Sequence, residues 1–386
     1  MAQLGGTRPP PACGPDHGDA QLSYPSLMVF KLGIVGVGNI FPAYLRTLQR
    51  SKLFNIVGIA NAGPGIGSAA RRAQEYRLPA MSLEALLDSD ADIILCLTPP
   101  LSHHAIGMRV LQAGKHFYTE KPLAATFAQG QELVALAERQ GLRLGSAPDT
   151  FYGAAAQTVR ALVDGGTLGP IRHGTAHFMA HGPDEWHPNP DFFYRTGAGP
   201  LLDVGVYYLT HLVHHLGPVA HVSGTAHTTH TERRIAVGPN AGKTLAVEVP
   251  THIVTQLAFS GGAQVVLTSS FDVWKHGHPP MELYGDAGSI QLPDPNRFGG
   301  TVRSAVRDGP WVRADGKRPY TTNMRGLGLV DMALALQSGR PQRCSAEMAL
   351  HVLEAMERAI VAGLGGHTQP LTTTCTRPAP LDPTPL

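Results

Sequence analysis

The stretch Val29-Phe-Lys-Leu-Gly-Ile-Val-Gly-Val-Gly38 decides the fold that we expect for this chain. Its apolar first half predicts a buried strand, and its glycines predict a tight turn before the amphipathic segment 39–51. From there to about residue 148, short apolar runs alternate with amphipathic segments, which is typical of parallel strands joined by helices. Six strands before about residue 148 predict a doubly wound parallel sheet of the Rossmann type.

The glycine turn gives the first indication of a ligand. Gly36 and Gly38 occupy the first two glycine positions of a G-x-G-x-x-G pattern, and Phe41 stands at the third. Without a Cβ at the turn, the backbone N–H groups of Asn39 and Ile40 can approach a pyrophosphate at the helix start. An ordinary tight turn between a strand and a helix is the alternative that this incomplete motif leaves open.

After Pro148 the pattern changes from strand–helix to strand–strand. One helix is predicted within 153–166, and further helices are predicted within 201–217, 328–339 and 345–363. Between them, long alternating stretches predict a large, mostly antiparallel open sheet in an α/β domain. These stretches are 171–182, 247–259, 262–274, 281–292 and 301–314.

The chain length also favours two domains. Its 386 residues exceed the roughly 250 to 300 at which one hydrophobic core stops growing. We therefore expect a nucleotide-binding domain over 28–148 and a substrate and oligomerisation domain over 149–366. Residues 1–27 read as a disordered extension, with Met28 as a second candidate start, and the Pro- and Thr-rich residues 367–386 read as a loose tail.

Composition excludes several classes of function. Lys and Arg number 31 against 29 Asp and Glu, a balance that does not supply the basic surface needed for nucleic-acid or anionic-membrane binding. No apolar run approaches the ~18 residues of a membrane span. The four cysteines form no C-x-x-C pair, so neither a disulfide framework nor a thiolate zinc site is predicted, and a reducing cytoplasm is the expected location.

Four further motifs carry a resemblance to a known family. They are TPPLSH at 98–103, AGKHFYTEKPLA at 113–124, GAGPLLDVGVYYLTHL at 197–212 and ELYGDAGSIQL at 282–292. In this order and spacing they resemble the glucose-fructose oxidoreductase, inositol dehydrogenase and rhizopine-catabolism protein family, Gfo/Idh/MocA. The resemblance covers about residues 30 to 363.

The resemblance implies a Rossmann domain that holds NAD or NADP, and a second domain whose open sheet covers the nicotinamide and forms a homodimer or homotetramer. It implies hydride transfer to or from a carbon of a sugar or polyol. Lys121 then corresponds to the catalytic lysine, Asp203 to the acid of D-x-G-x-H/Y, and Tyr207 to the general acid/base. Many relatives have histidine at the last position, so the substrate of the inositol branch does not transfer.

The same resemblance, together with the glycine turn and the strand ends, predicts which residues bind the cofactor. These are Gly36, Gly38, Asn39, Ile40, Asn61, Thr98, Pro99, His103, Glu120 and Lys121. Asn61 stands where an acid selects NAD and a base selects NADP, and its neutral amide favours neither. Arg71 and Arg72 either reach a 2′-phosphate or are solvated helix residues.

Elementary chemistry supports these catalytic assignments. Oxidation of a secondary alcohol needs a base at the hydroxyl and a cation that stabilises the developing alkoxide. Tyr207 and Lys121 provide both groups, and we expect the pKa of Lys121 to be depressed by burial beside positive charge. Asp203 lies one helical turn before Tyr207 and either binds a substrate hydroxyl or orients Lys121. The alternatives are a solvated lysine, a core aromatic residue and a helix cap.

Other polar and aromatic residues are candidates for contact with a sugar. Asp149 follows the sixth predicted strand, and Trp186 and His187 lie in a loop where a ring can stack on a sugar face. Their alternative roles are a domain junction and loop packing. His211, His214 and His215 have metal-ligand spacing, but no acid or cysteine completes a site. We therefore expect no metal and consider His211 a cleft residue.

Three functions remain open at this point. The first is an NAD(P)-dependent dehydrogenase or reductase that acts on a sugar, sugar derivative or polyol. The second is a glycosidase that retains NAD and uses transient oxidation, and net cofactor turnover separates it from the first. The third is a non-catalytic NAD(P)-binding regulator, against which Lys121 and Tyr207 argue.

Overall fold

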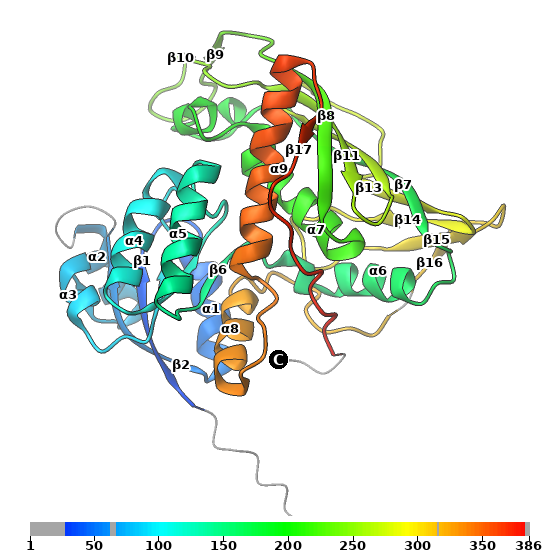
Figure 1. Ribbon diagram of the computed structural model, residues 1–386. Coiled ribbons are helices and arrows are strands. Elements are labelled where there is room, and N and C mark those ends of the chain that lie inside the picture. Colours follow the sequence, from blue (N-terminus) through cyan, green and yellow to red (C-terminus); the bar gives the residue numbers. More distant parts are fainter. Residues whose placement is uncertain (1–27, 62–66, 315, 383–386) are drawn as a thin grey trace, which may run out of the picture.

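The computed structural model describes residues 28–61, 67–314 and 316–382. Two sheets, each flanked by helices, lie side by side, with helix α9 (Ala346–Gly365) running between them (Figure 1). The predicted disordered extension 1–27 lies outside the described residues. No helix among the described residues has the length and apolar character needed to cross a bilayer.

The first sheet has six parallel strands in the order β3-β2-β1-β4-β5-β6, which confirms the predicted doubly wound fold. Its order reverses between β1 and β4, and ligands bind at such a switch point at the carboxyl ends of the strands. The strands are Phe30–Val35, Phe54–Ala60, Ala80–Met81, Ile93–Cys96, His116–Thr119 and Leu144–Ser146, numbered β1 to β6.

The helices between these strands begin where the sequence provides caps. Ser82 accepts a hydrogen bond from the third residue of α3, and Thr126 does the same for α5, so each satisfies one free N–H group. Helix α1 has no such side-chain cap, and its first turn contains a proline. The helices are α1 (Phe41–Ser51), α2 (Gly67–Tyr76), α3 (Leu83–Asp88), α4 (His103–Gln112) and α5 (Phe127–Arg139).

The second sheet has nine strands in the order β16-β15-β14-β13-β7-β12-β11-β8-β17. Only β7 and β12 pair in parallel, so the predicted, mostly antiparallel sheet is confirmed. Its strands are β7 (Ile171–Met179), β8 (Val219–His227), β11 (His252–Phe259), β12 (Gln264–Ser270), β13 (Met281–Gly285), β14 (Gly288–Leu292), β15 (Arg303–Val306), β16 (Val312–Arg313) and β17 (Gln369–Pro370). A separate hairpin pairs β9 (Glu232–Arg234) with β10 (Thr244–Ala246).

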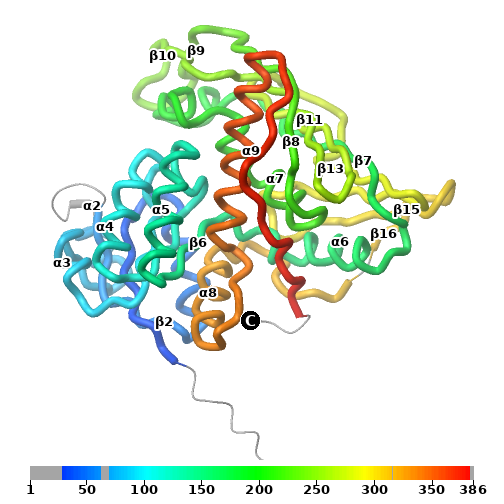
Figure 2. The backbone as a smooth tube through the Cα atoms, viewed as in Figure 1, coloured from blue at the N-terminus to red at the C-terminus, as the bar shows by residue number. Residues whose placement is uncertain are grey.

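Helices join the two sheets. Helix α9 packs against α5 on one side and against β8 and α7 (Val206–Leu216) on the other, and Figure 2 traces this path. Helix α8 (Leu327–Ser338) returns to the first sheet and packs against α1 and β6. Helix α6 (Ala154–Asp164) lies beside α7 and β14.

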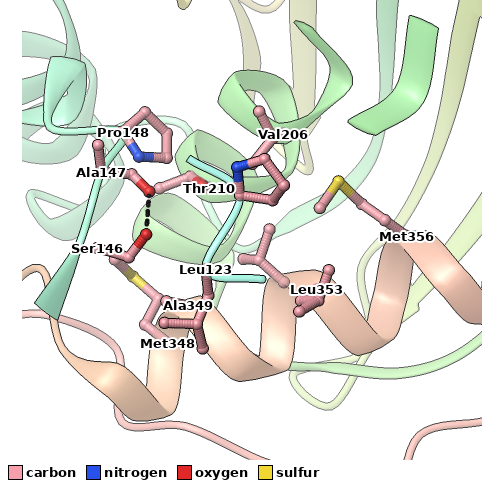
Figure 3. Close-up of a pocket in the computed structure, with 12 residues that line it drawn as sticks. Leu123, Ser146, Ala147, Pro148, Val206, Thr210, Met348, Ala349, Leu353 and Met356 are labelled. Atoms are coloured by element: carbon pink, nitrogen blue, oxygen red, sulfur yellow. Dashed lines mark hydrogen bonds between the residues drawn. The ribbon is translucent and has the colours of Figure 1, made fainter. Parts of the chain in front are cut away.

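The junction beside α9 is closely packed. Pro122 and Leu123, which follow β5, meet Val206 and Thr210 of α7 and Met348, Leu353 and Met356 of α9 around a small apolar cavity (Figure 3). This contact fixes the chain just after Lys121 against the helix that carries Tyr207. Dispersion and burial at the junction thereby hold two candidate catalytic residues at a set distance.

The prediction of a loose tail is wrong for the described part of 367–386. Strand β17 pairs with β8, Arg160 donates a hydrogen bond to the carbonyl oxygen of Pro378 at 2.7 Å, and the N–H of Leu381 donates to Gln157 at 2.8 Å. The tail lies on the edge of the large sheet because β8 offers unpaired backbone groups there. Residues 383–386 lie outside the described residues.

Candidate active site

A cleft of about 520 Å³ opens at the carboxyl ends of β1, β4 and β5, where the two halves of the molecule face each other. The first half contributes the glycine turn, the end of β4 and the turn after β5. The second half contributes the start of α7 and the loop before it. The lining residues used below are Gly38, Asn39, Ile40, Thr98, Pro99, Leu101, Glu120, Lys121, His187, Phe192, Phe193, Asp203 and Tyr207.

The glycine turn fits a pyrophosphate. Gly36 has φ +95°, and a Cβ there would lie 2.7 Å from the carbonyl carbon of Leu97, so only glycine fits. Gly38 is different, because a Cβ there would meet no atom within 4 Å and would project into open space at the cleft. Helix α1 starts directly afterwards without a side-chain cap, so its first N–H groups are available to an anion.

Lys121 and Asp203 form an ion pair across the cleft. The ammonium donates hydrogen bonds to Asp203 Oδ1 at 2.9 Å and to the backbone oxygen of Asp203 at 2.5 Å. Asp203 lies in a short π-helical turn, Leu201–Gly205, that leads directly into α7. Of the two roles considered for Asp203, this geometry supports the one in which it orients Lys121.

Tyr207 lies beside this pair on the first turn of α7. Its side chain is 6% exposed, and its ring centroid lies 5.3 Å from the ammonium of Lys121. Burial raises the pKa of the phenol above its ordinary value, and Glu120 raises it further, while Lys121 and Arg325 lower it. An ammonium and a phenol from different halves of the molecule therefore meet at the cleft.

The expected depression of the Lys121 pKa is wrong. Burial does lower it, but the carboxylate of Asp203, Tyr207 and Glu120 raise it by more, so the pKa lies above its ordinary value. The sequence pattern did not show that Asp203 pairs with this lysine. Lys121 is therefore a fixed cation at neutral pH rather than a group that exchanges its proton.

The carboxylate of Glu120 is held in place by the buried side chain of Tyr44. Its Oε1 accepts a hydrogen bond from the hydroxyl of Tyr44 at 2.6 Å, and its Oε2 accepts one from the N–H of Lys121 at 3.0 Å. The carboxylate thus fixes the backbone of the neighbouring lysine. Tyr44, on α1, was not among the candidates, because nothing local in the sequence places α1 against the turn after β5.

His103 lies behind the cleft wall rather than on it. Its side chain is fully buried, and its two ring nitrogens each lie 2.8 Å from a carbonyl oxygen, that of Thr98 and that of Pro122. The imidazole therefore connects the loop after β4 to the turn that carries Lys121. The prediction that His103 touches the cofactor is corrected to a positioning role.

Asn61, directly after β2, binds the start of helix α2. Asn61 Oδ1 accepts a hydrogen bond from the N–H of Ala69 at 2.9 Å, across the start of α2. The intervening residues 62–66 lie outside the described residues. Arg72 pairs with Glu75 on the same helix at 2.6 Å, which agrees with a solvated helix arginine.

The structure does not bring Asp149 and His211 into the cleft. Asp149 is 1% exposed and accepts hydrogen bonds from the N–H groups of Gly326 and Gly328 at the start of α8, while burial raises its pKa to about 6. His211 is buried against Thr150 at 3.1 Å, and burial lowers its pKa to about 3. Both expectations of substrate contact are corrected, because tertiary packing uses these side chains.

The loop that contains Trp186 and His187 contributes an aromatic wall. His187 lines the cleft, whereas Trp186 is 62% exposed and lies outside the lining, at the edge of a cluster of rings. Phe192 and Phe193 pack against each other with centroids 4.0 Å apart and line the cleft, and both were missed. The signal that the sequence offered was the adjacent pair Phe192-Phe193 in a loop rich in proline and aspartate.

Within the described ranges, one group of side chains has the spacing of a metal site, namely His181, Asp184 and Glu185. Asp184 also accepts a hydrogen bond from Tyr194 and lies 3.8 Å from the guanidinium of Arg233, so a cation already faces it. The histidines of α7 form no such group among the described residues.

Sequence comparison agrees with this architecture. Residues 30–147 match the oxidoreductase family with an NAD-binding Rossmann fold, and residues 156–291 match the GFO/IDH/MocA C-terminal domain. A dTDP-3,4-didehydro-2,6-dideoxy-α-D-glucose 3-reductase from Streptomyces antibioticus is 30% identical over 303 residues, which cover 72% of this chain and 89% of that one. A trans-1,2-dihydrobenzene-1,2-diol dehydrogenase from Bos taurus is 27% identical over 86% of this chain and 97% of its own.

Structural comparison gives the same fold. The crystal structure of the aldose-aldose oxidoreductase from Caulobacter crescentus in complex with glycerol superposes with a TM-score of 0.73. The superposition covers 89% of this chain and 100% of that chain, at 22% sequence identity.

Proposed function

Because the chain belongs to the Gfo/Idh/MocA family of oxidoreductases with an NAD-binding Rossmann fold, we propose that it transfers a hydride between a nicotinamide cofactor and a ring carbon of a sugar or polyol. The carbon bears a secondary alcohol in one direction and a ketone in the other. The observation that carries the proposal is the ion pair of Lys121 and Asp203 beside the buried phenol of Tyr207.

The proposed roles follow from charge and position. A bound nicotinamide supplies the hydride acceptor or donor. In the oxidation direction the hydride leaves carbon, and Tyr207, as phenolate, takes the proton from the alcohol oxygen. Lys121 donates a hydrogen bond to the same oxygen and stabilises its negative charge, and Asp203 holds the ammonium in position. In the reduction direction Tyr207, as phenol, returns the proton.

The aromatic wall supports a narrower substrate class. Phe192 and Phe193 offer ring faces and no hydrogen-bond donors, which suits a substrate ring with an exposed C–H face. The two relatives described above act, by name, on a dideoxy sugar nucleotide and on a dihydrobenzene diol, each with fewer ring hydroxyls than inositol. We therefore propose a deoxysugar derivative or an alicyclic diol rather than a fully hydroxylated ring.

Other parts of the proposal concern the setting of the enzyme. We place it in the cytoplasm, as a homodimer or homotetramer that assembles through the open face of the nine-stranded sheet. Residues 28–148 then act as the nucleotide-binding domain, and 149–366 as the domain that covers it. Size-exclusion chromatography with light scattering tests the assembly, and a monomer at micromolar concentration would contradict it.

A substrate screen tests the activity. Deoxysugars, alicyclic diols, unmodified sugars and inositols are incubated separately with NAD and NADP, and the absorbance of the reduced nicotinamide is followed. We expect turnover with at least one member of the first two groups. Cleavage of a glycosidic bond without net NADH formation would instead favour the glycosidase alternative.

A further inference from the structure

Tyr207 has a second cation beside it that no motif in the sequence indicates. The guanidinium carbon of Arg325 lies 5.9 Å from the centroid of the Tyr207 ring, a distance close to that of the Lys121 ammonium, 5.3 Å. Arg325 precedes α8, so it reaches Tyr207 from a different part of the chain. It does not line the cleft; it lines a separate polar pocket together with Asn296 and Asn323.

The two cations differ in what surrounds them. The charge of Lys121 is paired with the carboxylate of Asp203 at 2.9 Å, so part of its field is offset by a carboxylate in direct contact with it. Arg325 is held by neutral groups instead. Its Nη2 donates to Asn296 Oδ1 at 2.5 Å, and its Nη1 donates to Asn323 Oδ1 at 3.2 Å.

The other charged and titratable groups near Tyr207 are acidic or neutral. Glu120 raises the pKa of the phenol, and Tyr44, hydrogen-bonded to Glu120, lies close enough to interact with Tyr207. Asp149 faces Arg325 and anchors the start of α8 through Gly326 and Gly328. Lys121 and Arg325 both oppose the effect of Glu120 on the phenol, and Arg325 does so from the side of α8.

We propose that Arg325 is a positioning residue that keeps Tyr207 able to exchange a proton, by placing a second positive charge against the phenol from outside the substrate cleft. This inference rests on the proposed role of Tyr207. It goes beyond that role because the family motifs that identify Lys121, Asp203 and Tyr207 do not include Arg325. The guanidinium favours the phenolate, so it favours the form that accepts a proton from the alcohol.

Three variants of the full chain test the proposal. Arg325→Gln removes the charge and keeps hydrogen-bonding capacity. Arg325→Lys keeps a positive charge at this position, so it separates the loss of charge from a general disturbance of the fold. Arg297→Gln is the matched control, since Arg297 lines the same polar pocket but its nearest ion-pair partner is Asp294 at 3.7 Å.

The first readout needs no substrate. The ultraviolet absorbance of phenolate is followed against pH in the presence of NAD, and the curve of Tyr207→Phe is subtracted to isolate Tyr207. At an effective dielectric constant of about 20, removal of a charge at this distance should move the midpoint upward by about 1 to 2 pH units in Arg325→Gln. Arg325→Lys should lie nearer the wild type, and Arg297→Gln should match it.

The second readout is kcat/KM for alcohol oxidation against pH, with the substrate found in the screen. Arg325→Gln should lose about 10- to 100-fold near neutral pH and recover as the pH rises, because one pH unit in the midpoint is tenfold in phenolate. An unchanged midpoint, or a loss of equal size at every pH, would overturn the proposal. If the wild type oxidises no substrate, the proposed function fails, while the phenolate titration still decides the role of Arg325.

Discussion

Lys121 and Asp203 lie 82 positions apart in the sequence, yet their charged atoms are 2.9 Å apart across the cleft. The pairing joins the turn after β5 to the turn before α7, and it keeps the lysine protonated at neutral pH. Its chemical consequence is that the two side chains have different proposed roles. In the mechanism we propose, the lysine holds a charge in place and the neighbouring tyrosine moves the proton.

Replacement of the lysine tests its proposed role. Lys121→Met should lower kcat by about 10² to 10⁴-fold, because the developing alkoxide loses its cation. Steady-state kinetics measures the effect, with NADH binding by fluorescence as the control for an intact nucleotide site. Turnover close to that of the wild type would remove Lys121 from the mechanism.

Asp203→Asn tests whether Asp203 acts on Lys121 through its negative charge or only by holding the ammonium in position. The amide can still accept a hydrogen bond from Lys121, but the pKa of the lysine should fall because its carboxylate partner is gone. We expect kcat/KM of the variant to fall at alkaline pH as Lys121 loses its proton. This fall should begin at a lower pH than in the wild type. A profile identical to the wild type would mean that Asp203 does not set the charge of this lysine.

Tyr207→Phe removes the proton exchange and leaves the ring in place. We expect kcat to fall by about 10² to 10⁴-fold with little change in stability, since the buried ring keeps its packing. In the wild type, the raised pKa of the phenol predicts that alcohol oxidation accelerates as the pH rises through neutrality. Ketone reduction needs the phenol form and should stay constant over the same range. A Phe variant that keeps its rate would exclude Tyr207 as the acid/base.

The two glycines of the first turn form a matched pair. Gly36→Val should abolish cofactor binding and destabilise the fold, because its Cβ would lie 2.7 Å from Leu97 at a positive φ. Gly38→Ala should leave thermal stability unchanged and weaken NAD binding only, because its Cβ faces open space in the cleft. Calorimetric titration with NAD and thermal unfolding measure the two effects. Normal NAD affinity in both variants would place the pyrophosphate elsewhere.

Asp149 should make stability depend on pH. Its pKa is about 6 in the folded protein and near 3.8 without the fold, so burial favours the protonated form. Its contribution to stability is therefore fully present below about pH 3.8 and is lost as the pH rises through about 6. Asp149→Asn should lack this loss, which amounts to about 2 to 3 kcal/mol. Urea unfolding of both proteins at about pH 4 and about pH 7, one value below and one above the pKa in the folded protein, measures it.

Much of the fold could be predicted from the sequence because its signals are local. Alternation of apolar runs with amphipathic segments predicted the parallel sheet, and the glycine turn predicted the end of β1. The motifs that contain Lys121 and Asp203 placed both residues at the ends of elements that face the cleft. The catalytic roles themselves stay predictions until the variants are measured.

The rest depends on contacts between distant segments, for which the sequence carries no local signal. Asp149 and His211 look like site residues because polar groups near strand and helix ends often bind ligands, but here they cap α8 and pack against Thr150. Arg325 looks like any loop arginine until α8 is placed beside α1. The tail was predicted to be loose from its Pro- and Thr-rich composition, which gives no indication that residues 369–370 pair with the edge strand β8.

Helix α9 limits how the enzyme can move. It contacts α5 of the first half and β8 and α7 of the second, so a hinge motion between the halves would have to break packing on at least one of its faces (Figure 2). We therefore expect this packing to resist relative motion of the two halves around the cleft. The segment before α7 carries Phe192 and Phe193, and these two side chains line the cleft together with Leu101.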